Sequence, residues 1–485
     1  MAGASQIRRS GKACVIGSGP NGLAAAIVLA QAGLDVEVFE AEPTLGGAAR
    51  TLDLTLPGFH HDFGSAVHPL AAGSPFFTSL PLADYGLEWI HPPAPLVHPF
   101  DNGAALTIER DFTATAAALG ADGPAWRALL EPLATGWHSL AADILRPILS
   151  WPKHPLLLAR FGLNALSSAS SAARSHFRGD HVRALFAGLC AHSFLALDQP
   201  LSASFGLVLG AAAHAVGWPT PRGGAQSLSN ALAAHLTHLG GRITTGARIS
   251  SLGDLPSCDL ILCDITPRQI LALTGEPQPV ADKLTPEYRR ELAAYKYGPA
   301  AFKVDYALSR PIPWNARACL RAATVHLGST LADIEASEAA MASGQHSARP
   351  FVLLAQPTLF DPSRAPAGQH IAWAYCHVPN GSTEDMLDRL ETQIERFAYR
   401  FRDCILARHV SAPADLEARD ANLVGGDIGG GAVNRRQLLF RPTRRTYRTS
   451  APNIYLCSSS TPPGGGVHGM CGFNAARMAL RDHPR

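Results

Sequence analysis

The stretch Ala13-Cys14-Val15-Ile16-Gly17-Ser18-Gly19-Pro20-Asn21-Gly22 decides the fold of this 485-residue chain. Its small and β-branched apolar residues predict a buried strand, and the residues after it, 23–31, are strong helix formers. The glycines between them have the G-x-G-x-x-G spacing of dinucleotide-binding folds. In such folds the first glycine allows a tight turn, the second lets the backbone approach a pyrophosphate, and the third lets helix and strand pack closely. We therefore predict that the start of the helix binds phosphates, through Gly17, Gly19, Pro20, Asn21 and Gly22.

A carboxylate stands where such a fold binds a ribose. Residues 36–39 alternate like a second strand, and Glu40 closes it 18 positions after Gly22. That separation is near the usual spacing of about 20. A carboxylate there accepts hydrogen bonds from the hydroxyls of an adenosine ribose and repels a 2′-phosphate. The pattern favours a dinucleotide without that phosphate over NADP, and the alternative is a βαβ unit that binds no ligand.

Composition excludes several classes of protein. The chain is 47% hydrophobic and 16% charged with a formal charge of +2, and no apolar run reaches the roughly 20 residues of a membrane span. The basic stretch 435–448 is interrupted by apolar residues, so we interpret it as a solvated or lipid-headgroup face and expect no nucleic-acid partner. The nine cysteines form no C-x-x-C, and the pair His235 and His238 lacks a third ligand, so we expect no dithiol centre and no metal site. Arg8-Arg9 is followed by no separate apolar region, which predicts a cytoplasmic protein without an export leader.

Two more motifs follow the first strand–helix–strand unit: Gly46-Gly47-x-x-Arg50 and Gly58-Phe59-x-x-Asp62-x-Gly64. The glycine pair permits a second close backbone approach, and Arg50 is placed to meet a phosphate or a flavin edge unless it is a solvated loop arginine. Together with the first glycine turn and Glu40, these motifs resemble the opening of the phytoene dehydrogenase-like flavoproteins. That family includes carotenoid desaturases and isomerases, retinol saturases and the pyridine nucleotide-disulfide oxidoreductase domain-containing protein 2 group.

The C-terminal end carries a second glycine-rich turn. Residues 461–469 precede a predicted helix over 472–480, and this tail resembles the C-terminal signature of the same family. The resemblance implies FAD as cofactor, bound at both glycine turns about 450 residues apart. The C-terminal residues assigned to it are Ser458, Gly465, Gly466, Val467 and Gly469. Ser458 follows Cys457 where many relatives carry Gly-Asp, so the contact made there by an aspartate is expected to be weaker or made by backbone.

The chain leaves the α/β pattern of its first residues and returns to it twice, which predicts an α/β fold with two interleaved domains. A three-layer, Rossmann-like FAD-binding domain with a parallel sheet is expected from residues 1–75, 221–285 and 449–485. An α+β substrate domain with a mixed or antiparallel sheet is expected from residues 76–220 and 286–448. Helices are predicted over 111–119, 124–145, 156–177 and 181–195, and strands over 303–308 and 369–376. Residues 151–161 mix apolar residues with basic flanks, which indicates either peripheral membrane contact or a helix packed on its own domain.

The resemblance implies hydride transfer between flavin and a carbon–carbon bond of a hydrophobic polyene or related lipid. A redox-neutral isomerase, an amine oxidase and a non-catalytic flavin-binding protein are the alternatives. No aromatic cage or covalent cysteine of the amine oxidase kind can be located from the sequence. His61 and Asp62, and His468 beside the second turn, are the candidate proton acceptors, with a structural role as the alternative for each histidine. The substrate, the electron acceptor and the oligomeric state stay open.

Overall fold

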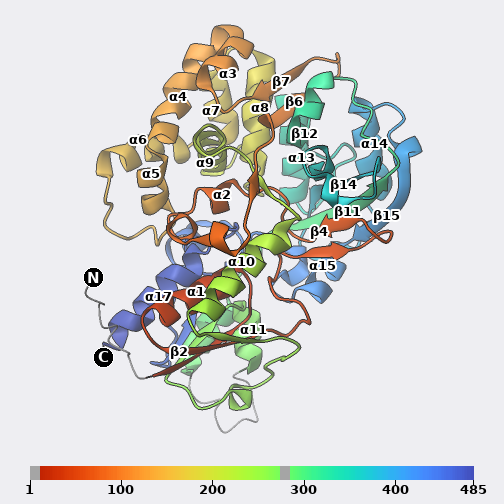
Figure 1. The fold of residues 1–485 in the computed structure, drawn as a ribbon. Helices are drawn as coiled ribbons and strands as arrows, with labels where there is room; N and C mark the ends of the chain where they lie inside the picture. The colour runs from red at the N-terminus through yellow and green to blue at the C-terminus, as the bar shows by residue number, and fades with distance from the viewer. Residues whose placement is uncertain (1–10, 274–283, 485) are drawn as a thin grey trace, which may run out of the picture.

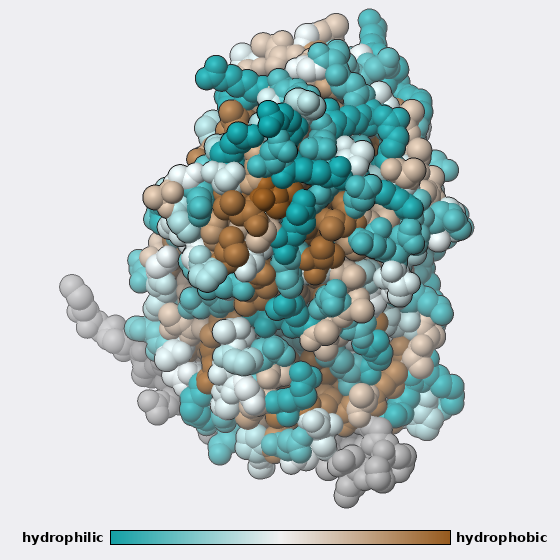
Figure 2. Space-filling view, turned by 90° about the vertical axis from the view of Figure 1, so that its right-hand side faces the viewer, coloured by the Kyte–Doolittle hydropathy of each residue, from teal (hydrophilic) through white to brown (hydrophobic). Residues whose placement is uncertain are grey.

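The computed structural model describes residues 11–273 and 284–484. In Figure 1 a lower lobe holds both chain ends, and an upper lobe places a layer of helices on the left beside a sheet on the right. Figure 2 turns the sheet side toward the viewer, where hydrophobic groups gather near mid-height among hydrophilic ones.

The lower lobe is built on a five-stranded parallel sheet. Its strand order is β16-β10-β1-β2-β9. The strands come from three distant parts of the chain: β1 (Lys12–Ile16), β2 (Asp35–Phe39), β9 (Arg242–Thr244), β10 (Leu260–Cys263) and β16 (Ile454–Leu456). The central strand β1 buries all of its residues except Lys12, as its apolar run predicts.

Helices cover both faces of this sheet, which gives three layers. Val15 on one face of β1 joins the large core with the helices α1 (Pro20–Gln31), α10 (Ala225–His238) and α17 (Met470–Asp482). Ile16 on the other face packs with α11 (Pro267–Leu273) and α12 (Pro286–Ala293). The alternation of strand side chains between two hydrophobic cores confirms the predicted Rossmann-like architecture.

The upper lobe contains a seven-stranded mixed sheet. Its order is β15-β11-β14-β13-β12-β6-β7, and all pairs are antiparallel except β12 with β6. The strands are β6 (Ala94–Pro99), β7 (Ala105–Ile108), β11 (Ala300–Leu308), β12 (Ala322–Leu327), β13 (Val352–Ala355), β14 (His370–Val378) and β15 (Ile405–Ser411). One face packs on α14 (Leu387–Phe397) in a separate core, and the other face turns toward the helical layer. The sheet bears out the predicted mixed sheet plus helices.

The helical layer differs from the sequence prediction in two places. Its elements are α2 (Pro69–Ala72), α3 (Phe112–Ala118), α4 (Gly123–Thr135), α5 (Trp137–Ile144), α6 (Pro155–Ala165), α7 (Ala169–His176), α8 (Asp180–Ala191) and α9 (Ser202–Ala215). The single helix predicted over 124–145 breaks at Gly136, and the one over 156–177 breaks before Ser168, which caps α7 through the Ser171 N–H. The apolar pattern continues through both positions, but glycine and serine favour helix ends, and the helices end there.

Shorter elements complete the chain. They are the hairpin β3 (Thr51–Asp53) with β4 (His60–Asp62), the pair β5 (Trp89–Ile90) with β8 (Thr220–Pro221), and the helices α13 (Leu331–Ala342), α15 (Pro413–Arg419) and α16 (Arg435–Leu439). Among the described residues, every helix is too short or too polar to cross a bilayer. The strands of the two main sheets come from the segments assigned to them, while the residue limits of the domains stay predictions.

Candidate functional site

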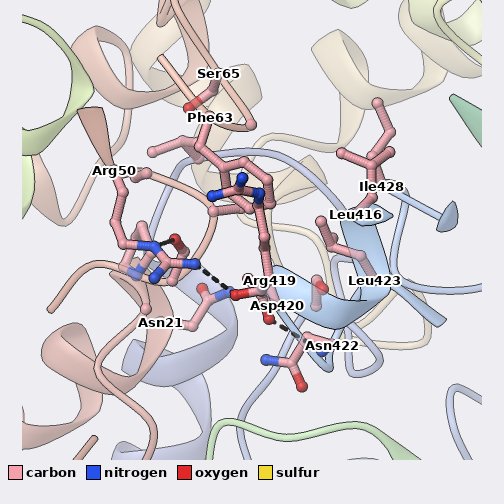
Figure 3. Close-up of a pocket in the computed structure, with 18 of the residues that line it drawn as sticks. Asn21, Arg50, Phe63, Ser65, Leu416, Arg419, Asp420, Asn422, Leu423 and Ile428 are labelled. Carbon is pink, nitrogen blue, oxygen red and sulfur yellow. Dashed lines mark hydrogen bonds between the residues drawn. The ribbon is translucent and has the colours of Figure 1, made fainter. Parts of the chain in front are cut away.

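One cavity of about 690 Å³ runs between the lobes and contacts both glycine turns. Residues 17–21 of the first turn and Gly466 and Val467 of the second lie in its wall. In Figure 3, Asn21 and Arg50 face Arg419 at the end of α15 and residues 420–422 that follow it. Two stretches separated by about 450 residues in sequence thus border a single space.

The first turn is tightly built around a carboxyl group from β10. The Gly22 N–H donates to Asp264 Oδ2 at 2.8 Å, and a Cβ at Gly19 would lie 2.7 Å from that oxygen. A Cβ at Gly22 would lie 2.1 Å from the Gly17 carbonyl oxygen, and Gly17 itself has φ of +95°. Each glycine is therefore required by its surroundings. Gly17 and Gly19 line the cavity, while Gly22 serves the packing of α1 on β1.

Glu40 lies at the end of β2 with its carboxylate already fixed. Its Oε2 accepts from the Ser18 N–H at 2.9 Å and from the Ser18 hydroxyl at 2.5 Å, and its Oε1 accepts from the Glu42 N–H at 2.9 Å. The side chain is 93% buried yet lines the cavity. This is the geometry of a preorganised acceptor for ribose hydroxyls.

Arg50 places a buried guanidinium in the cavity wall. Its Nε donates to the Gly47 carbonyl and one terminal nitrogen to the Arg419 carbonyl, each at 2.7 Å. The guanidinium lies 5.3 Å from the centre of the Phe63 ring. Gly47 lines the cavity beside Arg50, whereas Gly46 packs on Ser229 and does not. The solvated-loop alternative for Arg50 is therefore wrong, because the side chain is only 4% exposed.

Two carboxyl groups accompany this cation. Asp264 and Asp420 both line the cavity, and burial raises the pKa of each carboxyl above its usual range. A raised pKa reduces the negative charge near the first turn, while Arg50 and the start of α1 supply positive charge. The balance fits an anionic group such as a pyrophosphate at this end of the cavity.

The second turn is held by the crossing of α1 and α17. A Cβ at Gly472 would lie 1.8 Å from the Asn21 carbonyl oxygen, so these helices touch backbone to backbone. Gly469 precedes α17 with φ of +68°, and Gly465 packs on the Gly429 carbonyl. The Ser458 hydroxyl donates to the Ile265 carbonyl at 2.9 Å. Gly465, Gly469 and Ser458 thus support the turn without lining the cavity.

The end of the cavity in the upper lobe contains residues that the sequence analysis missed. Lys303 on β11 pairs with Asp305 at 2.5 Å, and its Nζ lies 5.4 Å from the ring centre of Trp373. Trp373 and Tyr375 on β14 stack with ring centres 5.5 Å apart and planes at 19°. Alternation along the predicted strand 369–376 puts these two rings on one face, but nothing in the sequence says that this face meets the cavity.

His61 and His468 lie outside the cavity wall. The Nε2 of His61 is 2.7 Å from the Thr55 hydroxyl, and burial lowers the pKa of His61 to about 3. His468 Nδ1 accepts from the Met470 N–H at 3.0 Å, so the ring caps α17, and burial lowers its pKa to about 4. The His61 ring lies 3.7 Å from the carboxylate of Asp305, which is the partner of the cavity residue Lys303. Both catalytic assignments stay predictions.

The cysteines and the pair His235 and His238 lie outside the cavity wall. All nine cysteines are free, and eight of them are buried. His235 and His238 pack against Tyr85. Within residues 11–273 and 284–484, no group of three or more histidine, cysteine, aspartate or glutamate side chains is arranged to hold a metal ion.

Known proteins share this arrangement. Residues 15–79 match the family described as NAD(P)-binding Rossmann-like domain. Pyridine nucleotide-disulfide oxidoreductase domain-containing protein 2 of Rattus norvegicus is 27% identical in an alignment that covers 97% of this chain and 93% of that protein. The 4,4′-diapolycopene oxygenase of a Methylomonas species is 27% identical over 140 residues, which are 27% of this chain and 28% of that protein. The solved structure of putrescine oxidase bound to putrescine has a TM-score of 0.61 at 15% identity and covers 98% of this chain and 99% of that one, which shows a shared fold.

The fold and the cavity define an oxidoreductase with a flavin or pyridine nucleotide cofactor. Over nearly its whole length the chain is similar to pyridine nucleotide-disulfide oxidoreductase domain-containing protein 2, and its opening residues match a Rossmann-like domain. This confirms the resemblance drawn from the motifs.

Proposed function

We propose that the protein is an FAD-dependent oxidoreductase that transfers a hydride between flavin and a carbon–carbon bond of a hydrophobic polyene or related lipid. The observation that carries the proposal is the single cavity that borders both glycine turns and continues to an aromatic end in the upper lobe. When bound, FAD supplies the hydride chemistry, and the chain supplies binding, orientation and exclusion of water.

The residues at the two turns support FAD over a nicotinamide dinucleotide. A nicotinamide dinucleotide needs only the first turn and its ribose carboxylate. The contribution of Gly466 and Val467 to the same cavity gives a second backbone approach, suited to the flavin end of a longer cofactor. Glu40 then holds the adenosine ribose, and Arg50 lies beside the pyrophosphate.

The aromatic end of the cavity favours a lipophilic substrate. Its wall is mostly hydrophobic, with side chains from both sheet and helices: Leu70, Leu209, Trp218, Leu353, Trp373 and Tyr375. Burial of a hydrophobic substrate against such a wall contributes about 25 cal/mol for each Å² removed from water. The partial match to a diapolycopene oxygenase supports the same class of substrate.

Charge placement argues against an amine substrate. The four carboxyl groups that line the cavity belong to Glu40, Glu42, Asp264 and Asp420, and all lie on loops around the first turn. The charged group at the aromatic end is Lys303, whose ammonium lies over Trp373. A protonated amine there meets the ammonium of Lys303, and the carboxylate of Asp305 is already paired with that ammonium. Amine oxidation stays a second candidate, favoured by the stacked Trp373 and Tyr375 pair and the shared fold with putrescine oxidase.

Hydride loss from a carbon–carbon bond also requires a group that takes the proton from the neighbouring carbon. Lys303 and His192 are titratable side chains at the aromatic end. Burial lowers the pKa of His192 to about 3, so its ring is neutral at physiological pH, and its Nε2 lies 3.0 Å from His326 Nε2. Burial also raises the pKa of Asp305, the partner of Lys303, to about 6. We assign proton transfer to this group of residues.

Anaerobic mixing of the purified protein with candidate substrates tests the function. We expect the flavin absorbance to be bleached by a partly saturated polyene in micelles and not by putrescine. Bleaching by putrescine alone makes the protein an amine oxidase. Conversion of the polyene without net change in saturation makes it an isomerase, and no response to any lipid extract favours a non-catalytic flavoprotein.

A paired variant locates the chemistry. Replacing Lys303→Met together with Asp305→Asn removes both charges and leaves no buried ion unpaired. We expect unchanged flavin content and a bleaching rate lower by about 100-fold, the scale of acid–base catalysis. Lys296→Met, which changes an exposed lysine, is the matched control. An unaltered rate in the paired variant overturns the assignment.

A further inference from the structure

Exposed hydrophobic side chains are concentrated in one segment of the helical layer. Trp151 and Leu156 are each 87% exposed and Leu163 is 80% exposed. The segment 148–166 contributes six of the eleven large hydrophobic side chains that are exposed among the described residues: Ile148, Leu149, Trp151, Leu156, Leu163 and Leu166. We call these six side chains the α6 patch. The other five are spread over separate elements.

The α6 patch projects from the edge of the molecule. Figure 1 shows α5 and α6 at the left margin of the upper lobe, away from both sheets. Only Ala165 of α6 is fully buried, while Leu157 and Phe161 pack against the large core. The helix is thus anchored along one side and presents leucines to solvent on another. A concentration of exposed hydrophobic side chains in one segment is typical of a binding surface.

The exposed charge near the α6 patch is mostly positive, because the neighbouring Asp143 is buried and contacts Arg146 and His154. Residues 144–179 contain five arginines and lysines and no aspartate or glutamate. Lys153 and Arg160 are exposed, and neither is ion-paired with a carboxylate in the part of the chain that the structure describes. Arg174, farther along, is already paired with Glu335 at 2.7 Å. Lys153 and Arg160 thus have no carboxylate partner among the described residues, and they accompany a tryptophan and exposed leucines. This combination suits the surface of a lipid bilayer, where phosphate groups cover hydrocarbon chains.

The α6 patch also lies close to the aromatic end of the cavity. Helix α6 packs against α9, and α9 contributes Leu209 to the cavity wall. Helix α2, which contributes Leu70, packs on α9 as well. One layer of helix therefore separates the α6 patch from the hydrophobic wall.

We propose that the α6 patch docks on an anionic lipid bilayer. Its hydrophobic side chains enter the boundary of the acyl chains, and Lys153 and Arg160 contact lipid phosphates. The depth of such binding is a few ångströms, because the structure offers a short helix and loop rather than a spanning segment. The link to a lipophilic substrate rests on the proposed function, but the docking itself does not.

Sedimentation with vesicles tests the docking. We expect the full-length protein to bind vesicles of phosphatidylcholine with phosphatidylglycerol, and to bind pure phosphatidylcholine about tenfold more weakly. The variant Trp151→Ser, Leu156→Ser, Leu163→Ser is expected to lose about tenfold or more in binding to the anionic vesicles. Lys153→Glu with Arg160→Glu is expected to abolish the preference for the anionic lipid.

A matched control changes exposed hydrophobic side chains elsewhere. Tyr399→Ser with Leu406→Ser, 74% and 45% exposed, is expected to leave vesicle binding unchanged. The proposal fails if the native protein does not sediment with anionic vesicles, or if the triple variant sediments as well as it does. A dimer in solution that the triple variant dissociates, without vesicle binding, identifies a second copy as the occupant and also overturns it. Flavin content and bleaching by micellar substrate are measured on the same variants. A failure of the proposed function is thereby distinguished from a failure of membrane docking.

Discussion

Glu40 shows how a single side chain is prepared for its ligand before the ligand arrives. Ser18 and Glu42 hold both carboxylate oxygens, and Ser18 belongs to the glycine turn itself. Glu40, to which we assign the ribose, and the glycine turn, to which we assign the phosphates, are therefore one hydrogen-bonded unit. Moving either one displaces the other.

Replacing Glu40→Gln tests this unit. Glutamine keeps one acceptor oxygen but removes the charge, and a hydrogen bond to a charged group contributes about 1.5–3 kcal/mol. We expect FAD to bind about tenfold or more weakly, measured by quenching of flavin fluorescence on titration of the apoprotein. Glu37→Gln on the same strand, where the side chain contacts Thr244 and Arg242 outside the cavity, is the control. Equal affinity in the Glu40 variant removes the ribose assignment.

Among single residues, the sequence predicted those that line the cavity near the first turn but not those that line it in the upper lobe. Glu40, Gly19 and Arg50 follow from local motifs, because the turn and its neighbours are close in the chain. Lys303 and Trp373 do not, because their approach depends on how β11 and β14 pair and which face of the mixed sheet turns inward. Pairing of distant strands leaves no signal in a single sequence.

Among the elements, the crossing of α1 and α17 is what brings the two turns together. Gly472 sits where these helices meet, and each helix follows one of the two turns. Their backbone contact allows no side chain. The position of the second turn relative to the first is thereby set by a residue that lies outside the cavity wall.

The variant Gly472→Ala is expected to separate the helices. Overfilling a close contact costs about 1–3 kcal/mol, so we predict a lower midpoint of thermal unfolding and reduced flavin content in the purified protein. Gly162→Ala provides the comparison, because no atom lies within 4 Å of its Cβ and alanine favours a helix by about 1 kcal/mol. Equal flavin content in both variants contradicts the role given to the crossing.

The cap of α17 predicts a dependence on pH. Burial lowers the pKa of His468 to about 4, from an ordinary histidine value of about 6.5. Because the unfolded chain takes up the proton first, stability is complete above pH 6.5 and falls by about 1.4 kcal/mol per pH unit as pH drops toward 4. His468→Asn keeps an acceptor for the Met470 N–H but does not titrate. Denaturant unfolding of this variant at several pH values should show a shallower loss, and an identical slope would refute the burial effect.

Element prediction succeeded where local pattern and tertiary environment agree. The strands predicted over 303–308 and 369–376 correspond to β11 and β14, whose residues are almost all buried. The two long helices of the helical layer were wrong, because Gly136 and Ser168 end helices in a way that the apolar period does not reveal.

The whole molecule is organised by a chain that enters the parallel sheet three times. β1 and β2, then β9 and β10, then β16 join one sheet, and the intervening segments build the upper lobe. The cavity consequently collects residues from nearly the full length of the chain, from Ile16 to Val467. This interleaving could be predicted, because the sequence returns to an α/β pattern twice and both ends of the chain resemble one flavoprotein family. The shape of the cavity could not be predicted.

The central claim is that a single flavin dinucleotide spans the two turns. A crystal structure of the protein purified with its native cofactor tests it most directly. We expect one FAD per chain, with the adenosine ribose on Glu40 and the isoalloxazine ring beside Gly466 and Val467. A nicotinamide dinucleotide held at the first turn only, with protein side chains filling the space at the second, would contradict it.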